Sequence, residues 1–167
     1  MFICRTLEGW TKYSIIDAWI DSSAAGLPTK GKPVSLASLP QYEITISKPS
    51  NGYLTIQQNA AVNTYKGKHS VYFVVCKIGG KMIETMDDLS NANTVVKSPS
   101  PAKSLIQQSE CDFDKSVSYP YKFTMMVTTS ETIINGEGGY GMKIFCDDPN
   151  LKIRRLNPVR SGDDCEC

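Results

Sequence analysis

The residues of this chain that could carry out acid–base or nucleophilic chemistry are few, and they form no recognisable set. The only histidine, His69, lies in the stretch TYKGKHSVYF, just before a strand-like run. A hydrolase needs a base beside a nucleophile and a third group that orients the base. Nothing in the sequence pairs His69 with a particular Ser, Cys or Asp. We therefore predict no catalytic residues and no enzymatic activity.

Adjacent carboxylates at Asp87-Asp88 and Asp147-Asp148 are the closest approach to a metal site. Calcium takes about six to eight oxygen ligands, and neither pair lies in an EF-hand pattern, so capping of a turn or helix is the simpler interpretation. Structural zinc needs four ligands at close paired spacings, which the chain lacks. We predict no metal and no cofactor.

Six cysteines are present, at positions 4, 76, 111, 146, 165 and 167. An even number suits three disulfides in an oxidising compartment, but a chain of this length can bury a core without them. Cys76 and Cys146 lie in apolar runs, where a thiol behaves as a small buried hydrophobe, and we predict that both are free. Cys165 and Cys167 lie in a tail, residues 157–167, that we expect to be flexible and exposed, where they could bridge chains.

The glycine-rich stretch NGEGGYG, residues 135–141, shares only its composition with a phosphate-binding loop. Such loops lead into the N-terminus of a helix, whereas an alternating strand-like run follows here. Asn135-Gly136 instead fits a tight turn, and the further glycines fit a bulge. We predict a hairpin that pairs 119–128 with 140–146.

The elements that must position these residues are strands. Short apolar segments of period two recur between clusters of Gly, Pro, Asn and Ser, which is typical of an all-β domain. We predict a single antiparallel β-sandwich over residues 1–167, of the jelly-roll or immunoglobulin-like kind, with about nine strands. The predicted strands are 13–20, 42–47, 53–57, 70–78, 81–85, 119–128, 131–134, 140–146 and 151–155, and a short helix is expected near 85–89 or 104–108.

The run SVYFVVCKI is apolar on both faces, with Phe73 and Val75 on one of them. A strand of this kind is covered on both sides or lies at a subunit contact, so we predict Phe73 and Val75 as self-association residues together with Cys165 and Cys167. Gly79-Gly80 follows the run and predicts a tight hairpin to 81–85.

Aromatic residues near turns suggest a second kind of binding. Trp10, Tyr65 and Tyr140 border turn-like segments, and an exposed ring can stack on the apolar face of a sugar. Core or interface packing is the competing interpretation of these rings. Long segments rich in Pro and Gly at 21–40 and 98–104 are candidates for functional loops.

Charge and hydropathy exclude other classes of partner. The 167 residues include 18 Lys and Arg against 17 Asp and Glu, a net charge of +1, so no long-range field favours nucleic acid. No apolar run approaches the ~20 residues that cross a bilayer, and charges near the N-terminus interrupt any signal sequence. We expect a cytoplasmic protein or, alternatively, a secreted one whose leader has been removed.

The order of three motifs resembles the AidA/PixA inclusion-body protein family of bacteria. The motifs are SIIDAWID near the N-terminus, SVYFVVCKI in the middle and YPYKFTMMV followed by GGYGMKIFCDDP near the end; the matching positions are Ile16, Asp17, Ile20, Asp21, Tyr121, Phe123, Val127, Gly139, Tyr140, Asp148 and Pro149. The resemblance implies a cytoplasmic bacterial β-sandwich without an enzymatic role, of a kind that sometimes accumulates as crystalline inclusions. It supplies no functional residues, and the family's aromatic cluster before Asp-Pro is replaced here by Lys143, Ile144, Phe145 and Cys146.

Three functions remain open from the sequence. The first is a non-enzymatic sandwich that acts by self-association, as a homo-oligomer, or by binding a partner, because apolar strands and a near-zero net charge permit close packing of copies. The second is a lectin-like carbohydrate-binding module. The third is a secreted adhesin or effector stapled by disulfides.

Overall fold

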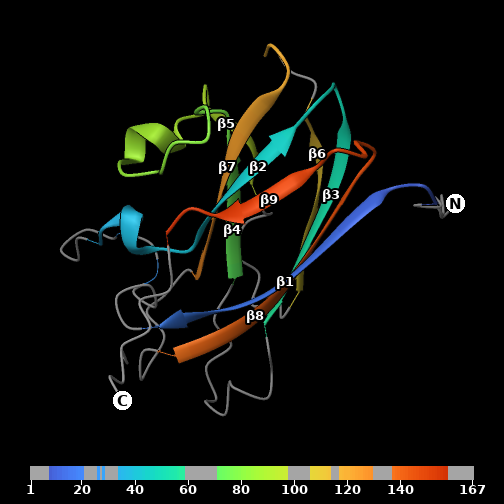
Figure 1. Ribbon diagram of the computed structural model, residues 1–167. Coiled ribbons are helices and arrows are strands. Elements are labelled where there is room, and N and C mark those ends of the chain that lie inside the picture. Colours follow the sequence, from blue (N-terminus) through green and yellow to red (C-terminus); the bar gives the residue numbers. More distant parts are fainter. Residues whose placement is uncertain are drawn as a thin grey trace, which may run out of the picture.

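The computed structural model describes residues 8–20, 26, 28, 34–58, 71–97, 106–113, 117–129 and 137–157. Within these ranges the chain forms nine strands and two short 3-10 helices (Figure 1), which confirms the all-β class. The strands are β1 (Thr11–Ile20), β2 (Gln41–Ile46), β3 (Asn51–Gln58), β4 (Val71–Cys76), β5 (Thr94–Lys97), β6 (Ile106–Asp112), β7 (Tyr121–Thr129), β8 (Glu137–Cys146) and β9 (Lys152–Arg155), and the helices are η2 (Leu36–Ser38) and η3 (Met86–Leu89).

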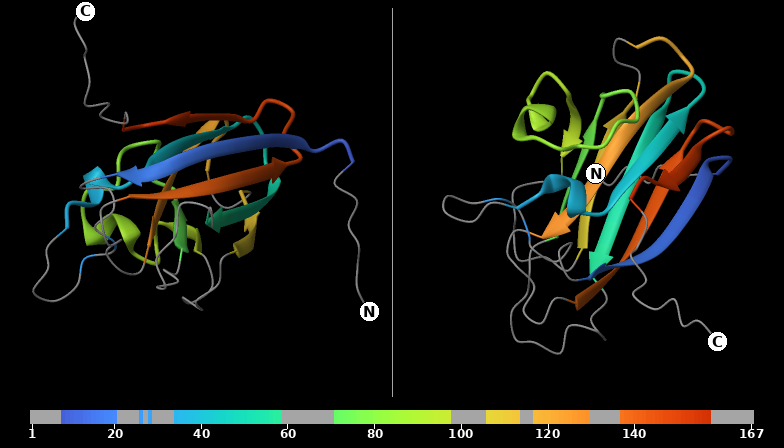
Figure 2. Two further views of the ribbon diagram at one scale, coloured as in Figure 1. Left: turned by 90° about the horizontal axis from the view of Figure 1, so that it is seen from below. Right: turned by 60° about the vertical axis from the view of Figure 1, so that its left-hand side comes forward.

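The strands form two antiparallel sheets packed face to face (Figures 1 and 2). The first sheet has the order β1-β8-β3-β6 and the second the order β5-β4-β7-β2-β9. The antiparallel pairs β1–β8, β2–β7, β3–β6 and β4–β5 are those of one long ribbon folded on itself. Rolling that ribbon into two layers gives a jelly roll, to which β9 adds beside β2. Of the two predicted kinds of sandwich, the jelly roll is the one observed.

This topology contradicts the predicted hairpin between β7 and β8. The two strands lie in different sheets: β7 pairs with β2 and β4, and β8 pairs with β1 and β3. A glycine-rich sequence predicts a change of chain direction but not which strands pair. In a jelly roll the connection between two consecutive strands can cross from one sheet to the other. Strand β8 begins at Glu137, so Gly138, Gly139 and Gly141 lie within a strand. The predicted strand 131–134 lies outside the described residues.

The main core lies between the sheets and is made by the inward residues of the period-two pattern. Burial of each large apolar side chain there stabilises the fold by about 1.5–3 kcal/mol. The Phe113 ring lies directly over Gly52, where a β-carbon would come within 2.6 Å of its Cε2 atom. The largest buried side chains of this core are Trp19, Tyr42, Tyr140, Phe73, Phe113 and Phe123.

A second apolar cluster lies on the outer face of the second sheet. It joins Val74, Cys76 and Met126 of the strands to Leu36, Leu39 and Ile83 of the segments that carry η2 and η3. Strand β4 is therefore covered on both faces by its own chain. Phe73 and Val75 are 1% and 0% exposed, so they are core residues and offer no surface for self-association, contrary to the prediction.

The segment after β4 is also not the predicted hairpin strand. Gly79 and Gly80 do turn the chain with positive φ, but residues 81–85 then cross the outer face of the second sheet. The side-chain amide of Gln41 holds this segment: its Nε2 donates to the carbonyls of Leu36 and Ile83 at 2.9 Å, and its Oε1 accepts from the Ile83 amide at 2.7 Å. Strand β4 pairs instead with β5, which the sequence did not reveal.

Strand β6 replaces the short helix considered for 104–108. Its inward positions include Gln107, which is 5% exposed, and Cys111, which is 2% exposed. Because the inward position 107 carries a polar residue, the sequence of β6 lacks the period-two pattern of apolar residues that predicts a strand. The other expected helix is present as η3, which a capping box between Thr85 and Asp88 begins.

Candidate functional site

Strand β1 forms one outer edge of the first sheet. It pairs with β8 along its whole length, from Thr11 opposite Cys146 to Ile20 opposite Glu137. No described strand pairs with its other side, and it runs along the rim of the sandwich (Figure 2). An unpaired row of backbone N–H and C=O groups on a strand of this length is a template for another strand.

Among the described outward side chains of β1, one large apolar group lies in solvent. Lys12, Ser14 and Ile16 are exposed, while Tyr13 and Ile15 pack against the core. Ile16 is 90% exposed, because its cross-strand partner is Gly141, which has no side chain to cover it. Four register positions away, the Lys12 ammonium lies 5.9 Å from the centre of the Phe145 ring and covers that aromatic.

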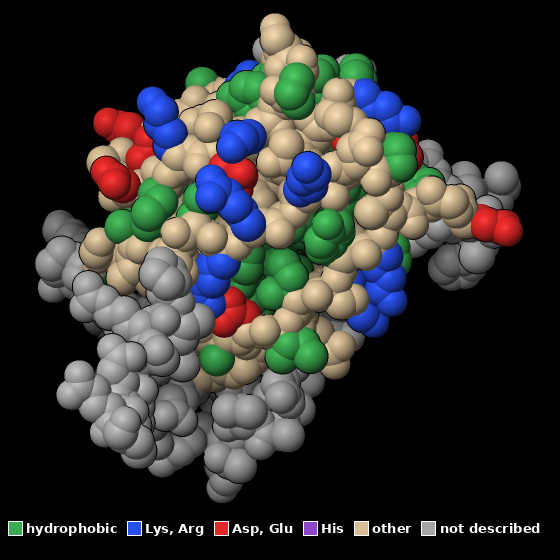
Figure 3. Space-filling view, viewed as in Figure 1, with side chains coloured by type: hydrophobic (Ala, Val, Ile, Leu, Met, Phe, Trp, Pro, Cys, Tyr) green, Lys and Arg blue, Asp and Glu red, His purple; other side chains and the backbone are tan. Residues whose placement is uncertain are grey.

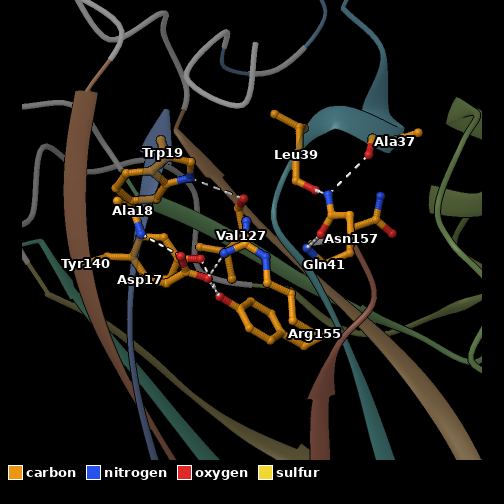
Figure 4. Close-up of polar contacts among 11 residues, drawn as sticks. Asp17, Ala18, Trp19, Ala37, Leu39, Gln41, Val127, Tyr140, Arg155 and Asn157 are labelled. Carbon is orange, nitrogen blue, oxygen red and sulfur yellow. Dashed lines mark hydrogen bonds and ion pairs between the residues drawn. The ribbon is translucent and has the colours of Figure 1, made fainter. Parts of the chain in front are cut away.

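A polar cluster ties the inner side of β1 to the other sheet. One carboxylate oxygen of Asp17, Oδ2, accepts hydrogen bonds from the Arg155 guanidinium of β9 and from the Tyr42 hydroxyl of β2. The other oxygen accepts from the Ala18 amide at 2.8 Å. Figure 4 shows Asp17, Tyr140 and Arg155 converging from strands of both sheets. The side chains of Asp17 and Arg155 are only 12% and 20% exposed, so the pair is largely withdrawn from water.

Two tyrosines and a tryptophan complete this cluster. The hydroxyls of Tyr42 and Tyr140 are 2.6 Å apart, and the Trp19 ring lies 4.3 Å from that of Tyr140, with its Nε1 donating to the Val127 carbonyl at 3.4 Å. Burial raises the pKa of both tyrosines well above the ordinary value of about 10. Both hydroxyls therefore stay protonated at neutral pH, and the cluster acts as an inter-sheet clamp on β1.

Asn157 fixes the chain just after β9. Its amide accepts from the Gln41 backbone at 3.0 Å and donates to the carbonyls of Ala37 and Leu39 at 3.2 and 2.6 Å (Figure 4). The predicted flexible tail therefore does not begin at residue 157, and its remainder lies outside the described residues. This anchoring holds β9, and with it Arg155, against the strand that carries Tyr42.

A second charged group lies on the outer face of the second sheet. Glu43 accepts from Arg154 Nε and Nη2 at 2.9 and 3.0 Å and lies 3.2 Å from Lys122 Nζ. The hydrogen bonds from Arg154 lower the pKa of Glu43. Figure 3 shows that basic side chains on this face are interspersed with acidic and apolar ones and form no single block. Arg154 and Lys122 thereby neutralise the charge of Glu43, which is 5% exposed.

The adjacent carboxylates cap turns. Asp148 is fully buried and accepts from the Ser47 amide at 2.5 Å, the Ser47 hydroxyl at 2.8 Å and the Asn150 amide at 2.9 Å. Asp147 accepts from the Asn51 amide at 3.0 Å. Burial alone would raise the pKa of Asp148, but these hydrogen bonds outweigh it and the pKa is lowered. The capping interpretation is confirmed for both residues.

The remaining predicted site residues are not brought together. Tyr140 is 1% exposed, so its ring face is not available to a sugar, and the prediction for this residue is corrected. Trp10 is partly buried just before β1. Tyr65, His69, Cys165 and Cys167 lie outside the described residues.

Three cysteines, Cys76, Cys111 and Cys146, are free and buried. The first and last confirm the prediction of free thiols, and a framework of three disulfides is not formed.

No protein-family model matches this chain, and no curated protein sequence matches it. The resemblance to the AidA/PixA family stays a prediction. Among the described residues no helix is long and apolar enough to cross a membrane. The feature that sequence reasoning missed is the β1 edge, for which Ile15-Ile16 was the available signal, because two adjacent apolar residues in an alternating strand place one of them on the polar face.

Proposed function

We propose that this protein is a non-enzymatic binding protein that receives a partner's strand at the free edge of β1. The observation that carries the proposal is Ile16, which is 90% exposed in the middle of a ten-residue edge strand. An added strand would satisfy the backbone groups of β1, and its side chains would cover Ile16 as cross-strand neighbours.

The clamp at Asp17 supports this function. A flexible edge would lose conformational entropy when a partner strand binds, and a strand already held in place loses less. Asp17 is the neighbour of Ile16, and its carboxylate is bound to both Arg155 and Tyr42. The binding edge is therefore rigid at the position where its apolar side chain projects.

The structural roles of the described carboxylates also fit the expected lack of catalysis. The carboxylates described above are engaged in an inter-sheet clamp, a charge pair and turn caps. Each has a structural partner that explains its burial. Binding is the function for which the exposed groups of β1 supply a physical reason.

A labelled peptide with the sequence TKYSIIDAWI, residues 11–20, tests the proposal by fluorescence anisotropy. We expect saturable binding to the full chain and a loss of affinity of at least about tenfold with the Ile16→Lys variant, since burial of a large aliphatic side chain is worth about 1.5–3 kcal/mol. Met86→Lys is the matched control, because Met86 is also exposed, at 60%, but lies in η3 away from β1. A peptide with proline in place of Ile16 should not bind.

Equal binding by wild type and Ile16→Lys, or no binding by wild type, would refute strand addition at this edge. Circular dichroism of both lysine variants shows whether they are folded. Since Ile16 makes almost no contact with the core, its replacement should leave the free energy of unfolding within about 0.5 kcal/mol of wild type.

A further inference from the structure

We infer that the strand received at the β1 edge is β1 of a second copy of this chain, paired antiparallel so that the two Ile16 side chains lie opposite each other. This inference rests on the proposed function and names its partner. It would join the two four-stranded sheets into one continuous sheet across a two-fold axis.

The outward side chains of β1 are suited to pairing with the same side chains of a second copy. The large apolar side chain of Ile16, which is 90% exposed, lies close to the middle of Thr11–Ile20. A two-fold axis at that position brings the same residue of each copy together, and each removes the other from water. A self-complementary contact of this kind needs no second surface on the molecule.

The pleat of the strand restricts the register. A two-fold axis perpendicular to the sheet continues the outer face of one copy into the outer face of the other, so outward residues must face outward residues. With Ile16 opposite Ile16, Ser14 lies opposite Ala18, and on the inner face Tyr13 lies opposite Trp19. Moving the register by the next allowed step would place Ile16 opposite Ser14 or Ala18 and leave most of its surface in water.

Charge also favours the antiparallel arrangement of two copies. Lys12 is the exposed charge at the start of β1. In this register it lies opposite position 20, so the two Lys12 residues are separated by eight residues along the strand, or about 27 Å. That distance is several times the Debye length of about 8 Å at physiological ionic strength. A parallel pairing would place the two ammonium groups side by side.

A contact made chiefly by one strand from each copy is smaller than the ~800 Å² per partner of a standard interface. We therefore expect a reversible dimer whose population depends on concentration. Sedimentation velocity over a series of concentrations should show a shift from monomer to dimer. The Ile16→Lys variant should stay monomeric over the same series, and Met86→Lys should follow wild type.

Cysteine pairs test the register while Ile16 remains in place. In a background with Cys4, Cys165 and Cys167 replaced by Ser, two proteins are made, Ser14→Cys and Ala18→Cys, and oxidised separately and as an equal mixture. Positions 14 and 18 of different copies lie directly opposite, whereas position 14 of one copy and position 14 of the other are offset by about 14 Å. A disulfide needs α-carbons within about 7 Å. We expect at least about tenfold more cross-linked dimer in the mixture than in either protein alone.

The outcomes separate this inference from the proposed function. Cross-linking in the mixture alone supports the second copy in this register. Equal cross-linking of Ser14→Cys by itself overturns the register. A wild type that stays monomeric but still binds the 11–20 peptide overturns the second copy and leaves strand addition standing. A dimer that survives Ile16→Lys shows that the copies meet at another surface and also overturns this inference alone.

Discussion

Asp17 of β1 and Arg155 of β9 form an ion pair that joins the outermost strands of the two sheets on one side of the sandwich. On the opposite side β5 lies close to β6, so the two layers approach there through their backbones. The β1 side is held instead by side chains, with Tyr42 and Tyr140 completing the connection. The strand that we propose as the binding edge is thus fixed to the second sheet.

Removing the Asp17 carboxylate should destabilise the fold strongly. Asp17→Ala leaves the Arg155 guanidinium largely buried without its anion, and breaking a buried pair in this way costs about 3–5 kcal/mol. Urea unfolding measures the loss. Lys12→Ala, at an exposed position of the same strand, is the control and should change stability by less than about 0.5 kcal/mol.

A double-mutant cycle separates the pair from its surroundings. The double variant Asp17→Ala, Arg155→Met should be more stable than the sum of the single changes predicts, by about 1–3 kcal/mol, because it leaves no uncompensated charge. Strict additivity would show that the two residues are not energetically coupled.

Two strand glycines should respond oppositely to alanine. At Gly52 a β-carbon would lie 2.6 Å from the Phe113 ring, whereas at Gly141 it meets no atom within 4 Å. We expect Gly52→Ala to destabilise by about 1–3 kcal/mol through overpacking. Gly141→Ala should be neutral or stabilising by up to about 1 kcal/mol, since alanine costs less chain entropy. Thermal unfolding of the two variants provides the comparison.

Acid should weaken the fold through Asp148. Its pKa is lowered in the folded protein, so the unfolded state binds a proton more readily. The stabilising contribution is complete above the ordinary aspartate value of about 3.9 and is lost as the pH falls through the lowered, folded-state pKa. Asp148→Asn should cost about 1–3 kcal/mol at pH 7.

Urea unfolding of both proteins from pH 7 down to pH 2 tests this. The difference in the free energy of unfolding between wild type and Asp148→Asn should shrink as the pH falls. Glu43, whose pKa is also lowered, is present in both proteins and contributes equally to the pH dependence of each. A difference that is independent of pH would contradict the assignment.

The three buried thiols should be inert in the native protein. Burial raises the pKa of Cys76 and of Cys146 to about 11, and that of Cys111 also lies well above its ordinary value. The reactive thiolate is therefore scarce at pH 8. Alkylation followed by peptide mass spectrometry should label these three residues only after denaturation, and native labelling at the rate of a free thiol would show that they are accessible.

Much of the local structure was predictable because period-two patterns act over a few residues. The predicted ranges lie within a few residues of strands β1, β2, β3, β4, β7, β8 and β9. Strand β6 was missed because Gln107 occupies an inward position. The segment 81–85 looked like a strand, but its backbone is bound by the Gln41 side chain.

The sequence by itself determined the all-β class and the free thiols at 76 and 146, since each depends on side chains close together in the chain. Only the tertiary structure decided that β7 and β8 belong to different sheets, that Phe73 and Tyr140 are core residues, and that Ile16 stands uncovered at an edge. These facts depend on which distant strand lies alongside each one. The meeting of Asp17 with Arg155, 138 positions apart, has no counterpart in any local pattern, because it exists only once both sheets are stacked.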